Sequence, residues 1–200
     1  MVLQSSFDED LENERRLSVL LDDYYKKHLK HYNFERIRDV PLQLMGVDLI
    51  LTHKTTGKTY FVDEKAQLYY LNEDLPTFAF ELSYLKKGTL KKGWLFDLSK
   101  KTDFYALITA IYSDEPNIYT SGKITMVNRK KLITLLKSKN LRFENFENRN
   151  LKQGKITIQE LNPQTEGYVY FSKNKKVEKP LNLILKLDFL IERGIAKRLV

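Results

Sequence analysis

The period of the hydrophobic pattern changes near Pro41, and this change constrains the fold more than any other feature of the sequence. Over residues 8–31 the apolar side chains recur every three or four positions, which predicts a long amphipathic helix. After Pro41 the apolar residues come in short or alternating runs, as they do in β-strands. A helix followed by clustered strands and then by mixed elements predicts an α+β (mixed α/β) fold.

The expected elements after Pro41 are mostly strands. The polar turn at residues 53–58 separates the first two strands, which predicts a β-hairpin. A segment rich in lysine and glycine, residues 86–93, is expected to turn the chain after the third strand. The predicted strands cover residues 47–51, 59–67, 77–85, 104–112, 123–127, 154–159 and 168–172, and the predicted helices cover residues 129–139 and 181–193.

The composition narrows the chemistry that this chain can perform. It has no cysteine, which excludes disulfides, thiolate metal sites and cysteine nucleophiles. Only three histidines are present, so a histidine-rich metal centre is not expected. Carboxylates and carbonyls would have to bind any metal ion, and these ligands suit magnesium, manganese or calcium.

Positive charge is concentrated after the first fifty residues. The net charge is +8, although residues 1–50 contain seven Lys/Arg against ten Asp/Glu. Such a surface would attract a polyanion such as DNA, although lysine-rich surfaces are often simply solvated. The residues expected to contact nucleic acid are Lys86, Lys87, Lys91, Lys92, Arg129, Lys130 and Lys131.

We expect a soluble, cytoplasmic protein that does not bind a membrane. The first sixteen residues lack a basic segment followed by an apolar run, so no signal peptide is predicted. No stretch approaches the ~18 apolar residues of a membrane helix.

Two carboxylates and an ammonium group are expected to converge on the hairpin. Side chains alternate along a strand, so Asp63, Lys65 and Gln67 should share one face, and the hairpin partner would place Asp48 beside them. The two carboxylates would repel each other, but a divalent cation between them would attract both. Glu14 lies within the apolar stripe of the first helix, where an unpaired carboxylate is costly, so we expect it to be buried and to point toward this cluster.

This arrangement resembles the PD-(D/E)XK nucleases, in which an acid on one strand precedes (Asp/Glu)-x-Lys on the next. Here Val47 replaces the proline of the motif. The resemblance implies a restriction-endonuclease-like core, with a central mixed β-sheet flanked by helices, and a Mg²⁺ or Mn²⁺ cofactor. The implied catalytic residues are Asp48, Asp63, Lys65 and Gln67, and the implied metal ligands are Asp48, Asp63, the backbone carbonyl of Glu64, and Glu14.

The resemblance covers roughly residues 8–112. We therefore expect a nuclease core over residues 1–112, with residues 113–200 as additional C-terminal α/β elements packed on the same domain. Such C-terminal elements can serve specificity or homodimerisation. The implied function is Mg²⁺-dependent hydrolysis of phosphodiester bonds in DNA, as an endonuclease or an exonuclease. Two alternatives stay open: a non-catalytic nucleic-acid-binding protein on the same fold, and a structural module whose lysines are only solvated.

Overall fold

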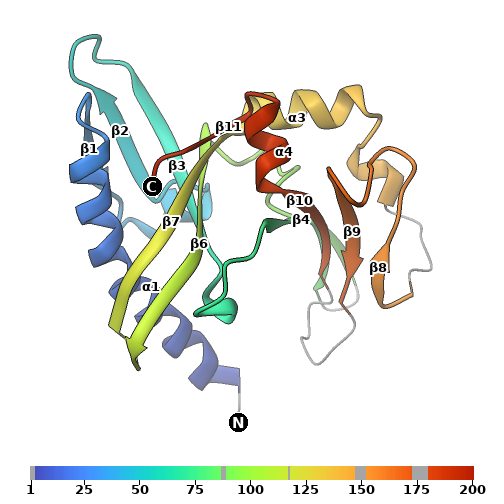
Figure 1. The fold of residues 1–200 in the computed structure, drawn as a ribbon, viewed down its shortest axis with the longest axis horizontal. Coiled ribbons are helices and arrows are strands. Elements are labelled where there is room, and N and C mark those ends of the chain that lie inside the picture. The colour runs from blue at the N-terminus through green and yellow to red at the C-terminus, as the bar shows by residue number, and fades with distance from the viewer. Residues whose placement is uncertain (1–2, 87–88, 117, 147–151, 173–179) are drawn as a thin grey trace.

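The computed structural model describes residues 3–86, 89–116, 118–146, 152–172 and 180–200. The chain forms two β-sheets flanked by a few helices, so the predicted α+β class is confirmed (Figure 1). The α-helices of the described residues are α1 (Leu3–His28), α2 (Val40–Leu44), α3 (Arg129–Ser138) and α4 (Leu187–Glu192). None of the helices in this described part is both long and apolar enough to cross a membrane.

The first sheet contains the predicted hairpin. Its strands lie in the order β1 (Tyr32–Arg36), β2 (Leu49–His53), β3 (Thr59–Ala66), β6 (Phe104–Glu115), β7 (Ile118–Asn128) and β11 (Ala196–Arg198). β2 pairs antiparallel with β1 on one side and with β3 on the other, whereas β3 and β6 run parallel. The sheet is therefore mixed, with β3 in its interior.

The second sheet is built from the connection between β3 and β6 together with C-terminal strands. Its order is β5 (Thr89–Lys92), β4 (Thr77–Lys86), β10 (Leu181–Lys186), β9 (Gly167–Phe171) and β8 (Gly154–Ile156), and all of these pairs are antiparallel. Both sheets thus contain strands from before and after residue 112, and that position falls inside β6.

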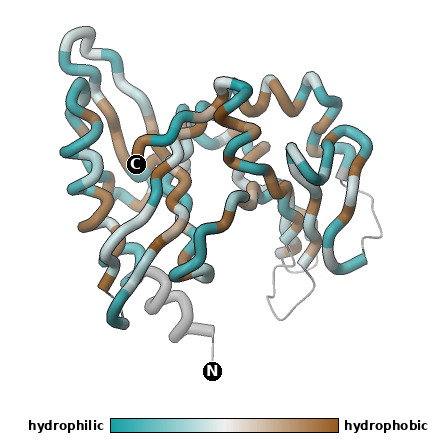
Figure 2. Tube along the Cα trace, in the orientation of Figure 1, coloured by the Kyte–Doolittle hydropathy of each residue, from teal (hydrophilic) through white to brown (hydrophobic). Residues whose placement is uncertain are grey.

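Two clusters of buried side chains hold these layers together. In one, Leu17 and Leu21 of α1 pack against Leu49 and Val62 on one face of the first sheet. The other fills the space between the opposite face of this sheet and the second sheet, and α3 and α4 also contribute to it. Figure 2 shows apolar residues along the strands of both sheets and a hydrophilic turn after β2.

Two local predictions are wrong. Residues 181–193 form β10 followed by the short helix α4, because Leu181, Leu183 and Leu185 alternate as buried strand residues between β4 and β9. A run of leucines at every second position satisfies a strand better than a helix. In the lysine-rich segment after β4, residues 89–92 form a strand rather than only a turn.

A charged network ties α1 to the first sheet. Arg36 of β1 donates hydrogen bonds through Nη1 to Glu64 Oε2 at 2.5 Å and through Nη2 to Asp22 Oδ1 at 2.6 Å. Tyr25 of α1 donates to Glu64 Oε1 at 2.7 Å, and its burial together with the charge of Glu64 raises the pKa of the Tyr25 hydroxyl. The Glu64 carboxylate is largely buried beside apolar side chains, and Arg36 supplies the positive charge that neutralises it.

Replacing Arg36 by alanine should destabilise the protein by about 3 kcal/mol, because it leaves the Glu64 carboxylate without its counter-charge. The Arg36 and Glu64 side chains are only 19% and 14% exposed. Urea denaturation at pH 7 would measure the change in the free energy of unfolding. The matched control is Lys26→Ala, which removes an exposed pair with Asp23 and should cost less than about 0.5 kcal/mol. Equal losses in the two variants would contradict a structural role for this network.

Candidate active site

Asp63 and Lys65 lie on the face of β3 that is turned toward the second sheet. In the parallel pair with β6, Asp63 is beside Tyr105 and Lys65 is beside Leu107, and both of these neighbours belong to the cluster between the sheets. Asp63 is 2% exposed, and Lys65 Nζ donates a hydrogen bond to Asp63 Oδ1. The alternation expected for this strand is therefore present, and it places a buried ion pair at the interior strand of the sheet.

Asp48 joins this pair from the other arm of the hairpin. It immediately precedes β2, and its backbone N–H donates to the Val62 carbonyl at 2.8 Å, which places Asp48 alongside Asp63. The Glu64 backbone N–H donates to Asp48 Oδ2 at 2.7 Å. Burial and the charge of Asp63 raise the pKa of Asp48 to about 7, although the Lys65 ammonium and the Glu64 N–H oppose the shift. The structure thus brings Asp48, Asp63 and Lys65 together.

Lys65 remains charged in this setting. Burial disfavours the ammonium form, but the carboxylates of Asp63, Asp48 and Glu14 outweigh burial and raise the pKa of Lys65. Its Nζ also lies 5.5 Å from the centre of the Trp94 ring, within the range of a cation–π contact. The Lys65 side chain is still 30% exposed, so a ligand could reach it.

Gly46 and Thr102 shape the wall beside Asp63, and the motif did not point to either of them. Gly46 has φ +73°, and a Cβ there would lie 2.4 Å from Thr102 Oγ1 and 3.1 Å from Asp63 Oδ2. Thr102 is buried and donates from Oγ1 to the Gly46 carbonyl at 2.9 Å. Only glycine fits this close approach at a left-handed backbone position. The glycine two residues before Asp48 was a visible signal for this requirement, whereas Thr102 is brought here only by folding.

Glu14 does not occupy the buried position that we expected. Leu17 and Leu21 are buried against the sheet, whereas Glu14, one turn earlier on α1, is exposed. The apolar stripe therefore does not enclose Glu14, and the prediction of burial is wrong. Its charge nevertheless contributes to the raised pKa of Lys65, so Glu14 lies within electrostatic range of this lysine.

The side chains of Glu64 and Gln67 make hydrogen bonds that stabilise the fold. The Glu64 side chain points to the α1 face and binds Arg36 and Tyr25, so only its backbone lies near Asp48. Gln67 Nε2 donates to the Thr77 carbonyl at 2.9 Å and so links the end of β3 to the start of β4. Among the described atoms, the buried Gln67 Oε1 has no hydrogen-bond partner. A role of Gln67 beside a phosphate, and of the Glu64 carbonyl as a ligand, stays a prediction.

The basic residues that we expected to contact nucleic acid differ in their exposure to solvent. Lys91, Lys92 and Lys130 are exposed. Arg129 is partly buried and donates to Tyr105 Oη at 2.9 Å and to the Asp97 carbonyl at 2.7 Å, so its guanidinium organises the interior. Lys131 is exposed and donates to the Gly194 carbonyl. Lys87 and the side chain of Lys86 lie outside the described residues.

The donor set fits a hard divalent cation that keeps part of its hydration shell. Over the described ranges, no group of three or more His, Asp or Glu side chains gathers closely enough to hold a metal ion. Mg²⁺ commonly binds through one or two carboxylates, and water and substrate phosphates complete its shell. Asp48 and Asp63 could supply these carboxylates, and the raised pKa of Asp48 shows that their shared site favours additional positive charge.

The contribution of Asp48 to the free energy of unfolding, measured without divalent cations, should fall as the pH rises from about 4 to about 7. Asp48 ionises near pH 4 in the unfolded chain but near 7 in the folded protein. The folded state therefore binds more protons over this interval, and raising the pH favours unfolding. In Asp48→Asn this contribution disappears, which thermal unfolding in EDTA at several pH values would detect.

The matched control for Asp48→Asn is Asp23→Asn, whose carboxylate is 72% exposed on α1 and should leave the pH profile unchanged. At pH 8, Mn²⁺ should raise the Tm of the wild type and of Asp23→Asn but not that of Asp48→Asn. A Tm that rises equally with Mn²⁺ in all three proteins would place the metal elsewhere.

Comparisons with known proteins gave no match. No family model matches the chain, and neither a curated protein nor a solved structure matches it. The function must therefore be inferred from Asp48, Asp63 and Lys65 and from the surface around them.

Proposed function

We propose that this chain is a metal-dependent nuclease that hydrolyses phosphodiester bonds of DNA. The observation that carries the proposal is the meeting of two carboxylates and one ammonium group, those of Asp48, Asp63 and Lys65, at the β2–β3 hairpin. All three come from the motif Asp48…Asp63-Glu64-Lys65. The register of the hairpin sets Asp48 opposite Asp63, and strand alternation sets Lys65 on the same face as Asp63.

The sheet order supports a restriction-endonuclease-like core as part of this proposal. The antiparallel strands β1, β2 and β3 are followed by β6 parallel to β3, and α1 covers one face. This is a central mixed sheet with a helix before it, as the resemblance implies. The second sheet, which covers the other face, would then be an addition to that core.

The residues of the candidate site suit phosphodiester hydrolysis. When bound, Mg²⁺ or Mn²⁺ would lower the pKa of a water molecule and offset charge on the phosphate oxygens. Asp63 orients Lys65 through their hydrogen bond, and the neighbouring carboxylates keep the ammonium protonated. A fixed positive charge in a partly buried site stabilises the negative charge that develops on phosphate. Asp48 must lose its proton before it can bind a metal ion.

The positive charge of the chain supports DNA as the substrate. Its sequence pI is about 9.4, and exposed lysines occur on β5 and at the start of α3. Lysine contacts to phosphate hold a nucleic acid without reading its sequence. These contacts would supply affinity, and Asp48, Asp63 and Lys65 would supply the chemistry.

One observation favours a second candidate, a nucleic-acid-binding protein that does not cleave. Lys65 already neutralises the buried Asp63, so this ion pair could stabilise the fold with no metal present. The two candidates differ in their need for divalent ions. Binding of DNA without cleavage in Mn²⁺ would select the second.

Asp63→Asn and Lys65→Ala should each reduce cleavage by about a hundredfold or more in Mn²⁺, because each removes a charge that the reaction requires. Plasmid nicking and degradation of a labelled single strand would measure the rates. In EDTA the Asp63 variant should bind DNA at least as tightly as the wild type, since a negative charge has gone, and the Lys65 variant slightly less tightly.

The matched controls for these variants are Asp23→Asn and Lys27→Ala on the exposed side of α1. They should cleave at the wild-type rate after the same purification. Cleavage that persists in Asp63→Asn at the level of the controls would exclude this metal site.

A further inference from the structure

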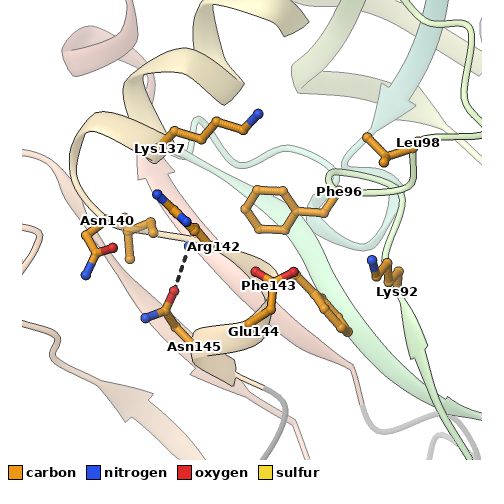
Figure 3. A pocket seen from close by; sticks show the side chains of 10 residues that line it. Lys92, Phe96, Leu98, Lys137, Asn140, Arg142, Phe143, Glu144 and Asn145 are labelled. Atoms are coloured by element: carbon orange, nitrogen blue, oxygen red, sulfur yellow. Dashed lines mark hydrogen bonds between the residues drawn. The ribbon is translucent and has the colours of Figure 1, made fainter.

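Two adjoining hollows lie between α3 and the segment that follows β5. Their volumes are about 760 Å³ and 510 Å³, and Phe96, Leu98 and Lys137 line both of them. Figure 3 shows the larger hollow, with Lys137 of α3 on one side and Phe96 and Leu98 on another. We call the two hollows together the α3 groove. Each is as large as a typical small-molecule site, which spans ~300–1,000 Å³.

The charge of the α3 groove is strongly positive. The acidic residues among its lining are Asp103 and Glu144, and the Asp103 carboxylate accepts a hydrogen bond from the Phe61 N–H. The basic lining residues are Lys92, Lys100, Lys101, Arg129, Lys130, Lys137 and Arg142. Such an excess of cations around a hollow raises the local concentration of a polyanion.

The α3 groove also exposes apolar side chains to solvent. Leu98 is 90% exposed, and it sits at the tip of a turn in which Asp97 Oδ1 accepts hydrogen bonds from the backbone N–H and the hydroxyl of Ser99. Arg129 also donates to the Asp97 carbonyl, which anchors the turn to α3. The turn is therefore held in place with its apolar tip in solvent. The Phe96 ring points into the larger hollow (Figure 3).

The smaller hollow borders the candidate active site. Lys100 and Thr102 line it, and Thr102 Oγ1 donates to the Gly46 carbonyl. A Cβ placed at Gly46 would lie 3.3 Å from Lys100 Cδ and 3.1 Å from Asp63 Oδ2. A strand in the α3 groove would therefore pass beside Lys100 and the wall formed by Thr102 and Gly46, on the other side of which Asp63 lies.

We propose that the α3 groove binds a single, unpaired strand of nucleic acid and directs it toward Asp63 and Lys65. Lysines along a groove track the phosphates, while exposed apolar and aromatic groups contact unpaired bases. In a duplex the base faces are stacked and cannot reach Phe96 or Leu98. The combination of cations with an apolar surface therefore favours a single strand over a duplex. Delivery to the site rests on the proposed nuclease function, whereas binding does not.

Fluorescence anisotropy with a labelled 20-nucleotide single strand, and with the duplex of the same sequence, tests this proposal in EDTA. Wild type should bind the single strand at least about tenfold more tightly than the duplex. Lys137→Glu and Leu98→Ser change exposed side chains, so neither should alter the Tm. Each should weaken single-strand binding about fivefold or more, and only Lys137→Glu should also flatten its dependence on salt.

Lys27→Glu is the matched control, because Lys27 is exposed on α1, on the opposite face of the first sheet. It should leave single-strand binding within about twofold of the wild type. Tighter binding of the duplex, or equal affinity of Leu98→Ser and the wild type for the single strand, would overturn the proposal. A protein that binds single strands through this groove but does not cleave them in Mn²⁺ would retain the α3 groove and refute the nuclease function. If the protein cleaves DNA but the Lys137 and Leu98 variants bind the single strand as tightly as the wild type, the nuclease function stands and the α3 groove proposal is refuted.

Discussion

The structure depends on the placement of charged side chains on both faces of β3, an interior strand of the first sheet. A carboxylate in such a position is costly unless a cation or hydrogen-bond donors compensate it. On one face Arg36 and Tyr25 compensate Glu64, and this contact also fixes α1 and β1. On the other face Lys65 compensates Asp63. The three consecutive residues 63–65 therefore organise the helix on one side and the candidate site on the other.

The two faces differ in how completely their charges are balanced. Tyr25 and Arg36 both donate hydrogen bonds to Glu64, and Arg36 also binds Asp22, so that network is closed. On the opposite face two carboxylates share one lysine, and burial together with the charge of Asp63 raises the pKa of Asp48 to about 7. An unbalanced negative site that can accept a cation is useful for binding and catalysis and is of no benefit to stability. This asymmetry makes the Asp48–Asp63 side the better candidate for function.

The second sheet links the candidate active site to the α3 groove. Its first two strands lie in the connection between β3 and β6, and the chain returns from β5 through Trp94, Phe96 and Leu98. Trp94 lies near Lys65, and the residues after it line the α3 groove. The same connection thus covers the candidate active site and forms one wall of a basic, partly apolar surface. Catalysis and strand binding would then depend on a single connection.

The sequence by itself determined the α+β class, the β2–β3 hairpin and the shared face of Asp63 and Lys65, because turn residues and alternation are local properties of the chain. It misled over residues 181–193 and over Glu14, because leucine spacing fits either a helix or a strand and a helical stripe does not reveal where it leaves the core. Only the tertiary structure decided that Arg36 meets Glu64, that Thr102 and Gly46 border Asp63, and that Leu98 lies near Lys137. These contacts join residues far apart in the chain, and their formation depends on how the two sheets and α3 pack, which no local pattern specifies.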